Sequence, residues 1–112
     1  MKSIRPFRPD DRAACMDIYA ENLSKALVPP QYASKFEQQL TETNNLTLVF
    51  TTGNRVVACG SVDYSPQEES AWLSFGLVHP DFQRQGIGST MLLTRMSLLE
   101  PSAERRYIVY FR

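Results

Sequence analysis

The segment that most constrains the fold is a strand-like run, a loop with two glycines and a helix-like run in unbroken order. AWLSFGLV is apolar and aromatic, which is typical of a strand, and HPDFQRQGIG follows it. STMLLTRMSLLE then has apolar residues at helical spacing. Glycine inside a helix costs about 1 kcal/mol relative to alanine, so Gly86 and Gly88 at a helix start need a local reason. Two explanations compete: a tight turn, or backbone amides that must approach a bulky anion.

The first part of the chain predicts one strand and two helices. KSIRPF alternates like a strand, and Pro9-Asp10-Asp11 provides N-cap chemistry for a helix to about Leu23. The Pro29-Pro30 pair ends that helix and opens a second one. The apolar face of the first helix is expected to contain Ala14, Cys15, Ile18, Tyr19 and Leu23, and that of the second Tyr32, Phe36 and Leu40.

The rest of the chain predicts a meander and a crossover. NLTLVFTTGNRVVACGSVDYS reads as a hairpin about Thr52-Gly53-Asn54, and AWLSFGLV is the next strand, with Pro101 ending the helix after it. RRYIVYF reads as a last strand, parallel to its neighbour. Alternation predicts Trp72, Ser74, Gly76 and Val78 on one face of their strand, and Leu73, Phe75 and Leu77 on the other. We therefore expect an α/β (α+β) fold: a mixed, mostly antiparallel sheet with helices on both faces.

Bulk charge excludes partners selected by charge alone. The 112 residues include 12 Lys+Arg and 12 Asp+Glu, a formal net charge of +0, which gives no footprint for nucleic acid or an anionic membrane. No run of about 18 apolar residues suggests a membrane span, and no run resembles a signal peptide. Cys15 and Cys59 are expected to be buried reduced thiols, and no metal site is expected. We expect one cytoplasmic domain over residues 1–112.

The glycine loop does not fit the commoner phosphate loops. It lacks the third glycine of the dinucleotide fingerprint, and no Gly-Lys-Ser/Thr follows. The ordered context is more specific: strand, Val78-His79-Pro80, Gln83-Arg84-Gln85-Gly86-Ile87-Gly88 and amphipathic helix. This order resembles the GNAT superfamily of acyl-CoA-dependent N-acyltransferases, whose pyrophosphate signature is Gln/Arg-x-x-Gly-x-Gly/Ala. Gln83, Gly86 and Gly88 occupy its three fixed positions.

The resemblance implies a path for acetyl-CoA along the strand and the loop. The amides from Gln85 to Ser89 and the Arg84 side chain would hold the phosphates at the helix N-terminus. The end of the strand would pair with the pantetheine arm, and the amide of Val78 would donate to the thioester carbonyl as an oxyanion donor. The implied cofactor-binding residues are Leu77, Val78, Gln83, Arg84, Gln85, Gly86, Ile87, Gly88 and Ser89.

The general base and acid are less defined than the cofactor path. Asp63, Glu68 and Glu69 are the acidic candidates nearest in sequence, with Glu69 preferred, although solvated turn charges are the alternative interpretation. His79 is the single histidine, and histidine is a common general base, with a surface or capping role as the alternative for this residue. Tyr32 and Phe36 correspond to the variable wall of the acceptor pocket and are candidate substrate contacts, with core packing as the alternative.

The resemblance covers Ile4 to Phe111, the first two-thirds of the family's fold. The family's usual thiolate-protonating tyrosine lies on a later helix. Tyr107 and Tyr110 lie three apart in the last strand, so at most one faces the cleft, and packing is the alternative for both. Three hypotheses follow: a shortened chain, completion by another subunit, or a member that binds acyl-CoA without turnover. The uncovered edge also makes a homodimer a hypothesis.

The sequence as a whole favours an enzyme that transfers an acetyl group from acetyl-CoA to a primary amine by direct attack. The alternative is a non-catalytic acyl-CoA-binding or regulatory module. A plain scaffold, in which the two glycines form only a turn, predicts no affinity for CoA.

Overall fold

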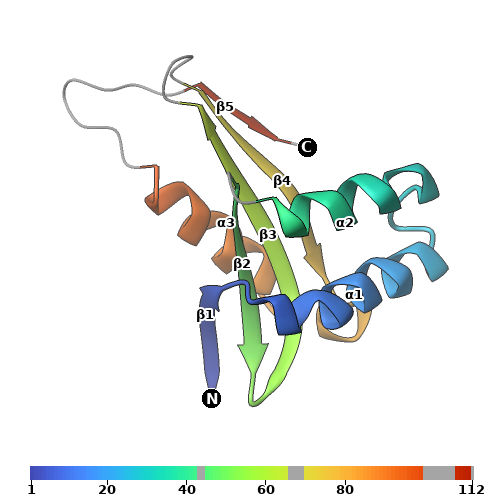
Figure 1. Cartoon of the computed structure of the whole chain (residues 1–112). Helices are drawn as coiled ribbons and strands as arrows, with labels where there is room; N and C mark the ends of the chain where they lie inside the picture. The colour runs from blue at the N-terminus through green and yellow to red at the C-terminus, as the bar shows by residue number, and fades with distance from the viewer. Residues whose placement is uncertain (43–44, 66–69, 100–107, 112) are drawn as a thin grey trace.

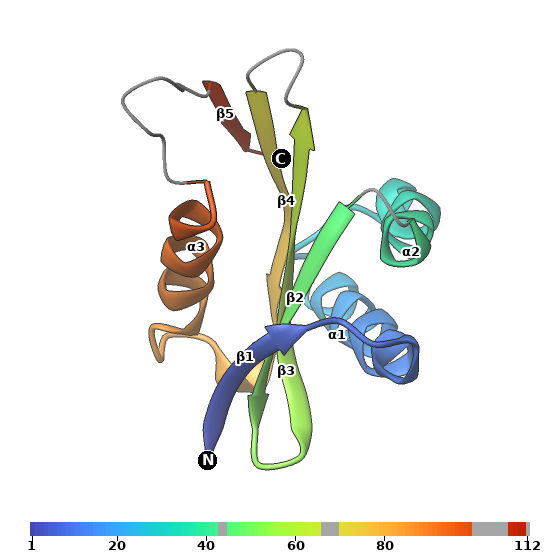
Figure 2. The same cartoon turned by 60° about the vertical axis from the view of Figure 1, so that its left-hand side comes forward.

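Five strands form one mixed sheet with helices on both of its faces (Figures 1 and 2). The computed structural model describes residues 1–42, 45–65, 70–99 and 108–111. The strands are β1 (Lys2–Pro6), β2 (Asn45–Thr52), β3 (Arg55–Ser65), β4 (Ser70–Val78) and β5 (Ile108–Phe111); the helices are α1 (Arg12–Ser24), α2 (Ala33–Thr41) and α3 (Ile87–Ser97), and the short 3-10 turns are η1 (Pro9–Asp11), η2 (Pro30–Tyr32) and η3 (Pro80–Phe82). The expected fold class is confirmed.

Spatial order in the sheet follows chain order. The first four strands pair antiparallel, and β5 pairs parallel with β4 after the α3 crossover. The parallel pairing joins only Ser70–Leu73 to Ile108–Phe111. Within the described residues, the second half of β4 is therefore paired on one side only, by β3.

The core lies on both faces of the sheet. Helices α1 and α2 cover one face and α3 the other, as the edge-on view in Figure 2 shows. The first cluster contains Cys15, Ile18, Tyr19, Phe36, Leu40, Val49, Cys59 and Leu77; the second contains Leu48, Phe50, Val57, Ala58, Ile87 and Met91. Burying these side chains contributes about 1.5–3 kcal/mol for each large aliphatic or aromatic group.

Helix α1 departs from its predicted apolar face at one end. Leu23 is 37% exposed, whereas its polar neighbour Asn22 is 3% exposed. Asn22 lies four residues after Ile18, so it continues the buried stripe of the helix, and Leu23 falls outside that stripe. The buried position is compatible with a polar side chain because Asn22 is fully hydrogen-bonded there, as described below.

A bulge in β4 reverses the predicted side-chain alternation. Ser74 pairs with Ser61, but Leu77 pairs with Cys59, so two residues of β4 oppose one residue of β3. Leu77 therefore joins the core under α1 and α2, while Val78 packs against the core under α3. The predicted facing of Leu77 and Val78 was wrong because simple alternation does not survive an extra residue.

Candidate functional site

The loop before α3 holds two residues with positive φ. Arg84 has φ 64°, and Gly86, the N-cap of α3, has φ 80° and ψ 5°. Glycine adopts this left-handed region freely, whereas an L-residue there costs roughly 1–2 kcal/mol. Strain of this kind is typical of ligand-binding loops, where the surrounding structure maintains it.

The two glycines have different local reasons. Gly86 is needed for its backbone conformation, because its φ is positive. Lack of space is not the reason, since a Cβ there would have no heavy atom within 4 Å. Gly88 has no such conformation, and a Cβ would lie 3.7 Å from Cγ2 of Val78, an ordinary van der Waals contact. Packing therefore does not explain a residue that weakens the first turn of a helix. Both glycines leave their backbone open to solvent, which suits the close approach of a ligand.

The first turn of α3 presents unpaired donors. No side chain caps this helix, and its first backbone bond from the loop is Thr90 N to Gly86 O, at 3.0 Å. Within the described residues, the amides of Ile87, Gly88 and Ser89 have no acceptor. They border a cavity of about 250 Å³, lined by Val78, Phe82, Gln83, Arg84, Gly86, Ile87, Gly88 and Ser89. Free amides at the positive end of a helix dipole bind anions, so this cavity suits a phosphate or pyrophosphate.

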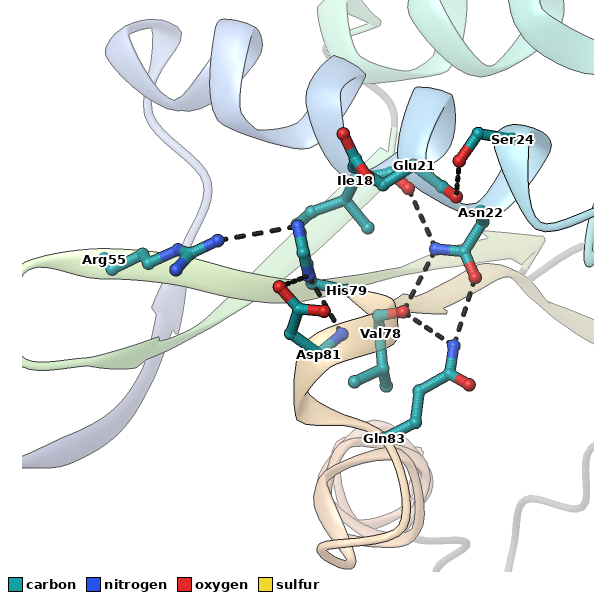
Figure 3. Close-up of polar contacts among 9 residues, drawn as sticks. All are labelled: Ile18, Glu21, Asn22, Ser24, Arg55, Val78, His79, Asp81 and Gln83. Atoms are coloured by element: carbon teal, nitrogen blue, oxygen red, sulfur yellow. Dashed lines mark hydrogen bonds and ion pairs between the residues drawn. The ribbon is translucent and has the colours of Figure 1, made fainter.

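A side-chain network joins the end of β4 to α1 and to the loop (Figure 3). The Asn22 amide donates to Ile18 O at 2.8 Å and to Val78 O at 3.0 Å. The Gln83 amide donates to Asn22 Oδ1 at 3.1 Å and to Val78 O at 3.0 Å. The side chain of Gln83, which the resemblance gives as cofactor-binding, thus holds the end of β4 to α1 and to the loop.

The backbone of Val78 is oriented toward the free edge of β4. His79 N donates to Val57 O at 2.8 Å, and Val78 lies opposite Ala58 in the next pair. In an antiparallel ladder the hydrogen-bonded pairs alternate with pairs whose N–H and C=O groups point outward. The carbonyl of Val78 follows this rule because its partners are side chains outside the sheet. Its amide consequently also faces away from β3.

The β4 bulge is held by aromatic packing. Phe75 has φ 51°, and its ring lies 5.1 Å from that of Phe36, which in turn stacks on Tyr19 at 5.5 Å. Phe36 is 1% exposed and belongs to the core, so its role here is packing against the bulge residue. It is absent from the lining of the cavity that contains Tyr32.

Two cavities meet at β4 from opposite faces of the sheet. The larger, about 530 Å³, lies on the side of α1 and α2 and is lined by Tyr19, Val28, Pro29, Tyr32, Lys35, Phe75, Gly76 and Leu77. The smaller, about 170 Å³, lies on the side of α3 and is lined by Cys59, Gly76, Leu77, Val78, Gly88, Met91, Leu92 and Arg95. Both include Gly76 and Leu77. Two ligands can therefore reach the same short stretch of strand from opposite sides.

His79 lies in a capping position. Its ring is buried, accepts the Asp81 amide at Nδ1 over 3.1 Å, and has Nε2 3.5 Å from an Arg55 nitrogen. It also packs edge-on against Phe82. None of the cavities described above includes His79, which matches the capping alternative for this residue.

Two further predicted residues, Tyr32 and Asp63, lie in the described part of the chain. Tyr32 is 45% exposed and lines the larger cavity. Asp63 lies in β3 and is half-buried. Glu68, Glu69 and Tyr107 fall outside the described residues, and Tyr110 lies in β5, where the backbone alone is described.

Sequence reasoning missed several residues of the site. Asn22 had a signal, because a polar residue on the apolar stripe of a helix needs a partner. Gly76 had another, since glycine inside a strand often indicates a bulge. For Lys35 and Arg95 the sequence pattern contains no signal that points to the site.

Over the part of the chain that is described, no three His, Cys, Asp or Glu side chains gather as metal ligands. Among the helices of that part, none is long and apolar enough to cross a bilayer. Cys15 and Cys59 are free and buried, as predicted.

Comparison with known proteins identifies similar folds. Residues 12–108 match the acetyltransferase (GNAT) family. Similar solved structures include the ribosomal-protein-S18-alanine N-acetyltransferase from Escherichia coli, with 23% identity and a TM-score of 0.73. The matched region covers 88% of this chain and 59% of the E. coli chain. The match to the PaiA N-acetyltransferase from Thermoplasma acidophilum, in complex with coenzyme A, covers 88% of this chain and 72% of that protein (13% identity, TM-score 0.70). The match to a GNAT-family acetyltransferase from Streptococcus pneumoniae covers 100% of this chain and 75% of that protein (19% identity, TM-score 0.71).

These comparisons differ in what they establish. Identities of this size establish the fold, and the chain spans 59% to 75% of the length of these three structures. No curated protein matches the sequence.

Proposed function

The chain belongs to the acetyltransferase (GNAT) family, and on that premise we propose that it transfers an acetyl group from acetyl-CoA to a primary amine. Family and fold support acyl transfer in general; the acetyl donor and the amine acceptor are our proposal. We take residues 1–112 as one domain. The observation that carries the proposal is the open, uncapped first turn of α3 beside the two cavities that meet at β4.

The pyrophosphate of CoA would bind at the start of α3. The amides of Ile87, Gly88 and Ser89 are free to donate, and Arg84 adds an exposed cation at the same cavity. Gly86 and Gly88 keep the approach to these amides open. Phosphate recognition by backbone donors at a helix N-terminus needs no further cation or metal.

The pantetheine arm would run along the free edge of β4. The outward amide of Val78 is a suitable donor to it, in the manner of an added strand. Val78 lines the same cavity as Gly88, so it lies near the phosphate end of the path. The thioester would lie farther along the strand, at Gly76 and Leu77, where the two cavities meet. Either the Val78 amide or a backbone donor of the bulge would stabilise the oxyanion.

The larger cavity would hold the acceptor. A neutral amine there would attack the thioester carbonyl, the C–S bond would break, and CoA would leave as a thiolate. Tyr32 stays a proposed substrate contact, and Glu69 a proposed base. The role of His79 as a base is the weaker proposal, because its ring already accepts an amide hydrogen bond away from the cavities.

The proposal is tested by titrating acetyl-CoA calorimetrically into the chain and into a Gly88→Asp variant. Aspartate in a first turn favours the helix, so the variant should fold, yet its carboxylate would repel the phosphates. Two like charges about 4 Å apart at a protein surface interact by about 4 kcal/mol, so we expect binding at least 100-fold weaker. Ser34→Asp is the matched control, since Ser34 occupies the same second position of α2 and is exposed.

The outcomes separate the candidate functions. Equal affinity in the Gly88→Asp variant would contradict the phosphate site, and no binding to the folded parent chain would contradict the proposal as a whole. An amine panel, assayed for free thiol, then distinguishes the enzyme from the binding module. Tight binding without acceptor-dependent thiol release favours the module.

A further inference from the structure

Arg95 is a buried cation in the last turn of α3. Its side chain reaches from the helix to the sheet and is 6% exposed. Nη1 donates to Ser61 O at 3.2 Å and to Ser74 O at 3.4 Å, and Nε donates to Met91 O at 3.4 Å. All three acceptors are neutral carbonyls, and all three bonds are long for N–H···O.

Two glycines make room for this guanidinium at the β4 bulge. A Cβ on Gly60 would lie 2.8 Å from Arg95 Cζ, and a Cβ on Gly76 would lie 2.8 Å from Nη2. The register places these glycines across from each other, where β4 carries its extra residue. Nη2 thus lies against the strand position that both cavities share.

The charge of Arg95 has no counterion within the described residues. The three ion pairs found there involve Arg5, Arg12 and His79, and no acceptor is found for Nη2. Burial lowers the pKa of Arg95, but an arginine stays protonated in a protein. Carbonyls satisfy its hydrogen bonds without neutralising it, and an unpaired buried charge is costly.

The guanidinium borders the smaller cavity together with Gly76 and Leu77. The volume of this cavity, about 170 Å³, is several times the roughly 30 Å³ that a water molecule occupies in the liquid. An anion there would face the cation at short range in a poorly solvated space. Acetyl-CoA brings no charge to this place, and the oxyanion of the reaction is transient. A permanent buried cation is best matched by a permanent anion on the donor.

We propose that Arg95 binds a carboxylate at the far end of the acyl group, so that the site prefers a carboxyacyl thioester, such as malonyl-CoA or succinyl-CoA, to acetyl-CoA. This inference rests on the proposed function and refines its donor. The chemistry is unchanged: the amine nitrogen forms the amide bond, the C–S bond breaks, and the amine proton is released. Arg95 takes no part in the bond changes and acts as a specificity-determining residue.

The test compares the affinities of CoA, acetyl-CoA, malonyl-CoA and succinyl-CoA for the full chain by calorimetry. We expect at least one carboxyacyl thioester to bind at least 10-fold more tightly than acetyl-CoA. Arg95→Gln should abolish that preference while leaving the affinity for CoA within about 3-fold. Arg12→Gln is the matched control, because Arg12 is exposed on α1 and borders none of the three cavities.

The comparison keeps the two proposals separate. Equal binding of acetyl and carboxyacyl thioesters by the parent chain would overturn the inference, and this result does not depend on whether the variant folds. A preference that persists in a folded Arg95→Gln chain would overturn it as well. No binding of any CoA compound would instead contradict the proposed function. A purely structural Arg95 predicts a lower melting temperature in the variant and no preference in either chain.

Discussion

Replacing Asn22 with alanine should loosen the junction between α1, β4 and the loop before α3. The side chain takes part in three hydrogen bonds, two donated and one accepted, in a position that is 3% exposed. A neutral hydrogen bond contributes about 0.5–1.5 kcal/mol net. The carbonyl of Val78 and the amide of Gln83 would still have each other, so no group is left without a partner.

The expected cost is therefore about 2–4 kcal/mol of the free energy of unfolding, including the small cavity that forms. In a chain of this size 1 kcal/mol corresponds to roughly 4–8 °C, so the melting temperature should fall by about 10 °C or more. Calorimetry or circular dichroism melts measure this. We also expect weaker binding of acetyl-CoA, because the loop that carries Gln83 loses one of its two anchors.

The control for this variant is Ser24→Ala on the same helix. Ser24 is exposed and bonds only within its own turn, to Glu21 O at 2.7 Å, so its loss should change stability by less than about 0.5 kcal/mol. If Asn22→Ala costs no more than Ser24→Ala, the network does not hold the junction and this reasoning is wrong.

Three further predictions concern stability and reactivity. Arg5 donates two hydrogen bonds to Asp11 and lowers the pKa of that carboxyl. The stability that this pair contributes is therefore complete above about pH 5 and declines as the pH falls below the usual Asp pKa near 4. In urea unfolding measured at several pH values, Asp11→Asn should flatten this decline. Gly60→Ala should cost about 1–3 kcal/mol by crowding Arg95, and a double-mutant cycle with Arg95→Ala should recover most of it; additive costs would refute the contact. The hydrogen bond that the Cys59 thiol donates to Cys15, together with burial, raises the pKa of Cys59, so a thiol reagent should label it only on unfolding; fast labelling of the folded chain would refute this.

The sequence predicted what depends on local pattern. The hairpin about Gly53, the helix before Pro29 and the crossover after Val78 follow from turn residues and periodicity, which act over a few positions. The glycine loop could be recognised because Gly86 and Gly88 have few other uses at the start of a helix.

What could not be predicted depends on contacts between distant segments. The sheet faces on which Leu77 and Val78 lie follow from one extra residue of β4 at Phe75. That bulge is held by packing against Phe36 of α2. The burial of Arg95 requires two glycines on separate strands to oppose each other, which periodicity cannot reveal. Such features depend on register, and register is set by the whole sheet.

The position of Gly76 and Leu77 between the two cavities has a kinetic consequence. A ligand on the α3 side occupies one face of β4, and a ligand on the α1 and α2 side occupies the other. Neither has to pass through the other's cavity to arrive or to leave. For the proposed transfer, this architecture imposes no steric order on donor and acceptor, and initial-rate patterns should be those of random addition through a ternary complex, with each product departing by its own side of the sheet.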